Sequence, residues 1–125
     1  MNKNNTTKIN PIVKQHEIWL GNIPASEGSH VQHGYRPVLI VSNDAANTHS
    51  PVVTVVPLTS KLCKHHLPTH VVLHEQGLDK NSIALCEQII TLDKSQLLRR
   101  IGYIYKSFDR LAIYHALAVQ LGMTA

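Results

Sequence analysis

The sequence has 125 residues, of which 43% are hydrophobic and 16% are charged, a balance typical of one globular domain with a modest core. The formal net charge of +4 favours a polyanionic partner, either a nucleic acid or an acidic protein. No apolar stretch is long enough to span a membrane, and the polar first residues lack the apolar region of a signal peptide. We therefore predict a cytoplasmic protein without membrane contact, with a flexible tail over 1–12 and a single domain over 13–125.

Short strands are predicted along the first two thirds of the chain. HEIWLGNI alternates enough for a first strand, and the aliphatic run PVLIV is typical of a buried strand. The residues DAANTHS favour a turn, and Pro57 marks an edge, a bulge or the end of the strand that follows. Such strands at regular spacing indicate a small antiparallel sheet or barrel; they cover 16–23, 37–43, 51–60, 69–74 and 82–90.

The last third of the chain changes to a helical pattern. A short helix is expected over 93–100, one more short strand over 102–105, and a longer helix over 107–121, with Ser107 as its N-cap and Gly122 as its stop. We interpret the apolar face of this helix as core or dimer contact; it comprises Leu111, Tyr114, Leu117, Ala118 and Leu121.

One consequence of the strand order concerns two polar residues. If 37–43 and 51–57 form an antiparallel hairpin about a turn near Asn47, the start of the first strand lies beside the end of the second. Arg36 would then face Leu58 and Thr59 where apolar strand gives way to loop, a position at which rigid elements often hold functional groups.

Several stretches of the sequence carry a family resemblance. GSHVQHGYRPVLIVSNDAANTHSPVVTVVPLTSK, LPTHV, LCEQIITLDKSQL and RIGYI closely resemble the MazF/PemK toxins of bacterial type II toxin–antitoxin pairs, from about Val13 to Gly122. The resemblance implies a mainly β fold, a compact Src-homology-3-like antiparallel barrel of the MazF/PemK/CcdB type, with a C-terminal helix. It also implies a homodimeric, sequence-specific endoribonuclease that needs no metal or other cofactor, cleaves single-stranded RNA and is silenced by an acidic MazE-like antitoxin.

The resemblance also assigns site residues. It makes Arg36 and Thr59 the catalytic pair, whereas Ser29 and Gln32 match an RNA-contacting loop and Glu87 and Gln88 a polar pair near the substrate groove. Two features depart from the family pattern and bear on which RNA sequence is read: a longer, histidine-bearing loop over 28–34, and Ile90 where an arginine is common. Further RNA-binding candidates are His30, His33, Ser60, Lys61 and Lys64.

The chemistry of RNA cleavage suits these residue types. Without a metal, the site must remove a proton from the 2′-hydroxyl, stabilise charge on the phosphorus centre and protonate the leaving 5′-oxygen. Arginine offers a permanently charged, planar fork for phosphate oxygens, and a threonine hydroxyl can donate one more hydrogen bond. Neither is a general base, so we hypothesise that His30 or His33 takes the proton; the alternative is that both are solvated loop histidines.

Other interpretations remain open at the level of sequence. Taken singly, Arg36 could be a solvated strand-entry charge, Thr59 an ordinary strand-end residue and Glu87 part of a polar strand face. The spacings His30-x-x-His33 and Cys63-x-His65-His66 reproduce no recognised zinc pattern, so no metal site is predicted, and Cys63 and Cys86 are expected to be free thiols. The alternative functions are a CcdB-like gyrase-binding toxin, disfavoured because the only tryptophan is Trp19, and a catalytically silent RNA-binding relative.

Overall fold

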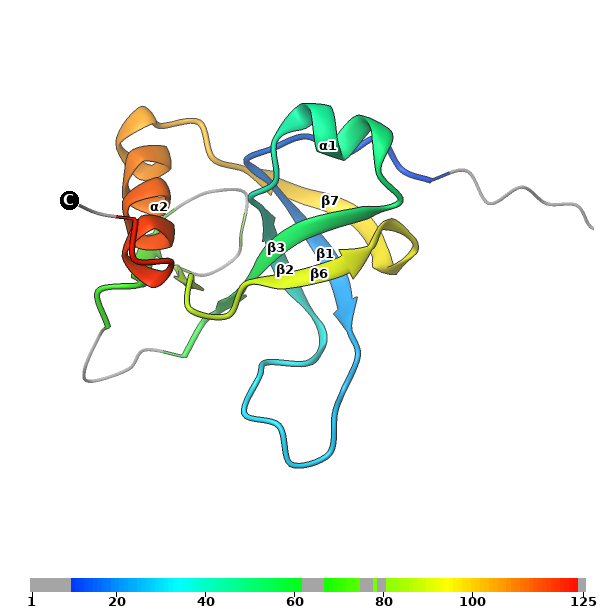
Figure 1. Cartoon of the computed structure of the whole chain (residues 1–125), viewed down its shortest axis with the longest axis horizontal. Coiled ribbons are helices and arrows are strands. Elements are labelled where there is room, and N and C mark those ends of the chain that lie inside the picture. The colour runs from blue at the N-terminus through cyan, green and yellow to red at the C-terminus, as the bar shows by residue number, and fades with distance from the viewer. Residues whose placement is uncertain (1–9, 62–66, 75–77, 79–80, 124–125) are drawn as a thin grey trace, which may run out of the picture.

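The computed structural model describes residues 10–61, 67–74, 78 and 81–123. A mainly antiparallel sheet is flanked by two helices, with α2 at one end of the molecule and α1 beside the long strands (Figure 1). The elements follow in the order β1 (Glu17–Ile23), β2 (Gly34–Ile40), α1 (Asp44–His49), β3 (Val52–Thr59), β4 (His70–Leu73), β5 (Ser82–Leu85), β6 (Ile90–Asp93), the 3-10 helix η1 (Lys94–Gln96), β7 (Leu97–Tyr103) and α2 (Ser107–Gln120).

Strand β3 is the centre of the sheet, because it pairs with three different strands along its length. Its first half pairs with β6, its middle with β2 and its last two residues with β5, all antiparallel. Pro57 lies at the changeover from β6 to β5, where a missing backbone N–H removes no ladder hydrogen bond on that edge. The predicted hairpin of the second and third strands is thus confirmed, with Val38 opposite Pro57.

The predicted, mainly antiparallel fold with a C-terminal helix is confirmed, and over the described residues its sheet is not closed. The strand order is β4-β5-β3-β2-β1-β7, and among the described residues no pairing joins β7 back to β4. Helix α2 packs against β4 at one end of this order, so a helix rather than a strand lies against that end of the sheet. No helix among the described residues is long and apolar enough to cross a membrane.

The described residues form two core clusters, which lie on opposite faces of the sheet. Ile18 and Trp19 are neighbours on β1, yet they belong to different clusters because successive side chains of a strand point to opposite faces. Ile113 and Ala116 of α2 complete the cluster that contains Ile18. Both faces of β1 are therefore buried. This packing also holds in place β2, which pairs with β1 and carries Arg36.

The predicted turn at 44–50 is wrong, because residues Asp44–His49 form α1. Asn43 caps the helix, its side-chain oxygen accepting the Ala46 N–H at 2.9 Å. The buried Asn47 side chain donates to the Ser42 carbonyl oxygen at 2.8 Å and accepts from the Ser42 hydroxyl. Asp, Asn and Ser suit turns and helix caps equally, and here the cap prevails.

Two further predictions fail between residues 82 and 100. The single strand over 82–90 is two strands, β5 and β6, separated by a turn in which the Gln88 N–H donates to the Leu85 carbonyl. The helix over 93–100 is η1 followed by β7, which pairs with β1 through both its apolar and its charged residues. Pairing with a buried strand overrides the helical propensity of Leu and Arg in this segment.

The C-terminal helix forms where predicted, and of the apolar face expected to be core or dimer contact Leu117 packs against the core. Gly122 ends it with φ of 67°, as expected, whereas the N-cap is Lys106 and makes no side-chain capping bond, so Ser107 is not the cap. Ile113 and Ala116 face the core, while Leu111 is 64% and Leu121 59% exposed. Two apolar stripes therefore run along α2, and the stripe that packs against the core is the one with Ile113 and the small Ala116.

Candidate functional site

A polar pocket lies where β2 begins and β3 ends. Extending the register from Val38 and Pro57 by two residues brings Arg36 opposite Thr59, as the hairpin prediction required. This Arg36 pocket has a volume of about 390 Å³; its lining includes Gln32, Tyr35, Arg36, Pro37, Leu58, Thr59, Ser60 and Lys61. Six residues of this lining are uncharged, and Arg36 and Lys61 give the pocket a positive charge.

The half-buried Arg36 is oriented by one backbone contact. Its Nε donates to the His33 carbonyl oxygen at 3.0 Å. Among the described residues no carboxylate pairs with the guanidinium, and its two terminal nitrogens make no hydrogen bond to protein. A fork with its stem held and both outer nitrogens unpaired is suited to bind two oxygens of a phosphate.

Thr59 is held by its hydroxyl oxygen, which leaves its proton available. Oγ1 accepts the Lys61 N–H at 3.2 Å, so the hydroxyl can still donate to a ligand in the pocket. Ser60 and Lys61 follow on the exposed rim. Lys64, the other predicted phosphate-steering lysine, lies outside the described residues, as do Cys63, His65 and His66.

The loop between β1 and β2 reaches the pocket through Gln32 alone. The Gln32 N–H donates to Gln88 Oε1 at 2.8 Å, which ties this loop to the turn after β5. Ser29 Oγ accepts the Val31 N–H at 3.1 Å, so it shapes the loop rather than lining the pocket. His30 is exposed, and the His33 ring lies 3.4 Å from the Val31 carbonyl; neither imidazole is among the described residues that line the pocket.

Glu87 belongs to a hydrogen-bonded cluster that the sequence did not reveal. Its Oε1 accepts the Thr69 hydroxyl at 3.1 Å and its Oε2 lies 3.1 Å from His70 Nε2. His70 Nδ1 accepts the Leu67 N–H at 3.2 Å, which places the proton of a neutral ring on Nε2, facing Glu87. The cluster joins β4 to the turn that carries Gln88, and LPTHV was the only sequence signal for it.

The described residues offer neither a reactive thiolate nor a cluster of metal ligands. Burial, and then the charge of Glu87, raises the pKa of Cys86 to about 12, so the thiol keeps its proton at neutral pH. Within the described residues no group of three or more His, Cys, Asp and Glu side chains is placed to hold a metal ion.

Comparisons with known proteins agree with this architecture. The protein-family model for the PemK-like, MazF-like toxins of type II toxin–antitoxin systems matches residues 14–119 of this sequence. The chain is 35% identical over 114 residues to a Staphylococcus epidermidis protein named endoribonuclease MazF, covering 90% of this chain and 93% of that one.

Solved structures show the same fold. An endoribonuclease in complex with its cognate antitoxin, from a mycobacterial species, has 27% identity and a TM-score of 0.71, covering 90% of this chain and 98% of that one. Deinococcus radiodurans MazF has 24% identity and a TM-score of 0.75, covering 90% of this chain and 99% of that one. The fold, the family model and the Staphylococcus relative together show that this chain belongs to the PemK-like, MazF-like toxin family of type II toxin–antitoxin systems.

Proposed function

We propose that this protein is a sequence-specific, metal-independent endoribonuclease that cleaves single-stranded RNA, the toxin of a type II toxin–antitoxin pair. The observation that carries the proposal is the Arg36 pocket, in which an unpaired guanidinium and a threonine hydroxyl share one polar concavity. The endoribonuclease activity of the Staphylococcus relative, as its name states it, supports the same conclusion. We also propose that the protein acts in the cytoplasm, where a toxin that cleaves mRNA meets its substrate.

The chemistry divides between the residues of the pocket. The 2′-oxygen of the substrate attacks the adjacent phosphorus, the bond to the 5′-oxygen breaks, and the products carry a 2′,3′-cyclic phosphate and a 5′-hydroxyl. Arg36 holds two phosphate oxygens and stabilises the charge that grows on them, while the Thr59 hydroxyl donates to the same group. Lys61 and Ser60 lie on the rim, where they contact the backbone of the RNA.

Base recognition falls to the loop and the turn that Gln32 and Gln88 join. An unstacked base is read by hydrogen bonds along its edges, and the amide groups of Gln32 and Gln88 have donors and acceptors for this. Ser29, His30 and His33 contact RNA from the same loop. The Glu87 oxygens already accept from Thr69 and His70, so Glu87 supports recognition by positioning Gln88.

We propose that the proton acceptor for the 2′-hydroxyl is His30 or His33, brought towards Arg36 when RNA binds. His33 is the stronger candidate of the two. It is closer to Arg36 along the chain, and its carbonyl oxygen accepts a hydrogen bond from Arg36 Nε. If His30→Ala and His33→Ala each leave the pH–rate profile unchanged, both histidines are solvated loop residues and the base lies elsewhere.

The partners follow from the family. The related mycobacterial endoribonuclease is in complex with its cognate antitoxin, and for this chain we propose an acidic antitoxin that competes for the positively charged pocket. We also propose a homodimer, because α2 exposes the apolar residues Phe108, Leu111 and Leu121. Leu111→Asp should halve the mass measured by light scattering; an unchanged dimer would place the contact on another face.

The decisive experiment uses purified protein, mixed RNA and an excess of a metal chelator, with sequencing of the 5′ ends. The wild type should cut at one short motif and leave 5′-hydroxyl ends. Arg36→Ala should lose about 10³-fold or more in rate, and Arg36→Lys, which keeps the charge but not the fork, should also be impaired. If the folded wild type cleaves no RNA, the proposal is wrong. Binding of RNA without cleavage would then favour the catalytically silent RNA-binding protein, and binding of gyrase but not of RNA would favour the gyrase-binding toxin.

A further inference from the structure

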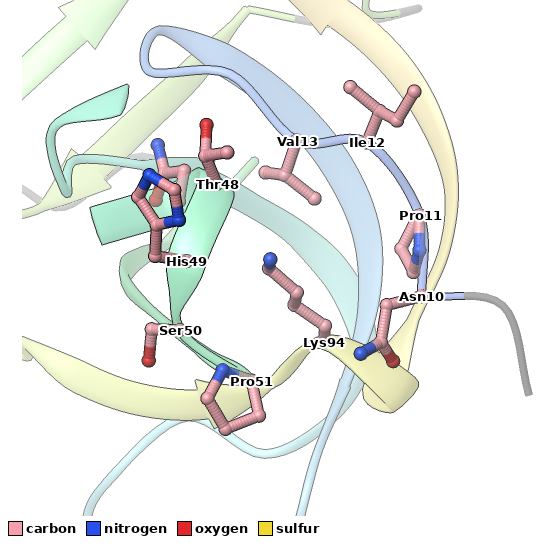
Figure 2. Close-up of a pocket in the computed structure, with 10 residues that line it drawn as sticks. Asn10, Pro11, Ile12, Val13, Thr48, His49, Ser50, Pro51 and Lys94 are labelled. Atoms are coloured by element: carbon pink, nitrogen blue, oxygen red, sulfur yellow. The ribbon is translucent and has the colours of Figure 1, made fainter. Parts of the chain in front are cut away.

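A second polar pocket lies far from Arg36, between α1, η1 and the segment that precedes β1. Figure 2 shows this Lys94 pocket, which has a volume of about 380 Å³. It adjoins the first residue of β3, because the Lys94 N–H donates to the Pro51 carbonyl oxygen at 3.0 Å, whereas Thr59 is the last residue of that strand. Its lining includes Asn10, Pro11, Ile12, Val13, Asn47, Thr48, His49, Ser50, Pro51 and Lys94.

Lys94 is the unusual member of this lining. The residue is 5% exposed, and its side chain extends from η1 into the middle of the pocket (Figure 2). Within the described part of the chain, no hydrogen bond or ion pair involves its ammonium group. Burying a charge without a partner costs several kcal/mol as an order of magnitude, so a buried lysine is normally paired. The ammonium therefore faces a place where a counter-charge can bind.

The walls of the pocket suit a negative ligand. None of the described lining residues is acidic, so nothing there repels an anion. The His49 imidazole, also in the lining, makes no hydrogen bond or ion pair within the described residues and is a second nitrogen available to a ligand. Pro11, Val13 and Pro51 form apolar wall, and the volume is within the range of small-molecule sites, about 300–1,000 Å³.

We propose that the Lys94 pocket binds a small oxyanion, a phosphate or carboxylate group carried by a small molecule. Lysine binds either group as a point charge, so the shared chemistry is a compact anion seated on the ammonium with its remaining atoms against the apolar wall. The site is separate from the proposed RNA site, which lies at the other end of β3, and it does not depend on the endoribonuclease activity.

The test is an NMR titration of the full-length protein with inorganic phosphate and, separately, with acetate, at constant ionic strength. Wild type should show saturable amide shifts at Val13 and at Thr48–Ser50 with at least one of the two anions, and the stronger binder identifies the group. Arg36→Ala should leave these shifts unchanged. Absence of saturable shifts in the lining with both anions would overturn the proposal.

Two variants separate binding from a structural role of Lys94. Lys94→Met keeps the length of the side chain and removes the charge, and it should weaken anion binding at least tenfold. Lys106→Met removes an exposed lysine at the start of α2 and should bind as the wild type does. Equal affinity in folded Lys94→Met and wild type would show that the ammonium is not a ligand; should Lys94→Met not fold, His49→Ala provides the same comparison, with weaker binding expected.

Discussion

At the scale of single residues, the Arg36 pocket depends on which atoms are already occupied. Arg36 Nε is bonded to the His33 carbonyl oxygen, so the two terminal nitrogens are the ones left for a ligand. Thr59 Oγ1 accepts a backbone N–H, which leaves the hydroxyl proton. These contacts aim both side chains before any substrate arrives, and such preorganised donors are what stabilise developing charge in a transition state.

The hydroxyl of Thr59 can be tested apart from its shape. Thr59→Val keeps the branched side chain and removes the donor, so single-turnover cleavage should slow by about 10²-fold. Thr59→Ser keeps the donor and should stay within about tenfold of wild type. RNA affinity, measured by fluorescence anisotropy, should change little in either variant. A Thr59→Val enzyme as fast as wild type would remove Thr59 from the mechanism.

At the scale of elements, a histidine joins the start of β1 to α2. His16 has φ of 75°, an unusual backbone for a residue other than glycine. Its N–H donates to the Ile40 carbonyl, its own carbonyl accepts the Ile104 N–H, and its Nε2 lies 3.0 Å from the Tyr114 hydroxyl. Burial, and then the charge of Arg110, lowers the pKa of His16 below its ordinary value of 6.5, although Asp44 acts in the opposite direction.

This pKa makes stability depend on pH in a defined direction. Well above pH 6.5 His16 is neutral in the folded and the unfolded chain, and its contribution to stability is complete. As the pH falls below that value the unfolded chain binds a proton that the folded chain resists, so the free energy of unfolding decreases until the folded pKa is passed. His16→Asn, which tolerates the same backbone, should flatten this decrease.

The measurement is urea denaturation between pH 5 and pH 7.5, compared with the wild type. His115→Asn is the matched control, because His115 is an exposed residue of α2, and it should retain the wild-type slope. If the free energy of unfolding of His16→Asn and of wild type decreases equally as the pH falls, the burial of His16 does not contribute to the pH dependence of stability.

At the scale of the whole molecule, α2 presents two apolar stripes with different tasks. Ile113 is 3% exposed and belongs to the core cluster, whereas Leu111, two residues earlier, is 64% exposed. In one chain only the first stripe has a partner. The second is the surface that the proposed homodimer would cover.

Alanine substitutions should separate the two stripes. Ile113→Ala leaves a cavity in the core and should lower the free energy of unfolding by about 2–5 kcal/mol. Leu111→Ala, on the exposed stripe, should change it by about 0.5 kcal/mol or less at protein concentrations where the chain is monomeric. Chemical denaturation followed by circular dichroism measures both. Similar losses in the two variants would mean that the core extends around the helix.

The sequence alone determined the elements with a local signal and the order in which they occur. The sequence segments that end at Ile23, Ile40 and Thr59 are apolar and β-branched enough to favour strands by themselves. Gly122 ends α2 because glycine adopts positive φ readily. The hairpin of β2 and β3 followed from that order, and with it the meeting of Arg36 and Thr59 in one pocket.

Only the tertiary structure decided the features that depend on distant partners. Residues 97–100 became part of strand β7 because β1 lies beside them and pairs with them. On α2, Ile113 faces inward because its stripe packs against the core. Glu87 found Thr69 and His70 across 18 and 17 residues of chain, and Lys94 was buried without an ion pair in the described structure. Local propensity carries no information about such contacts, because their free energy depends on neighbours that only the folded chain brings together.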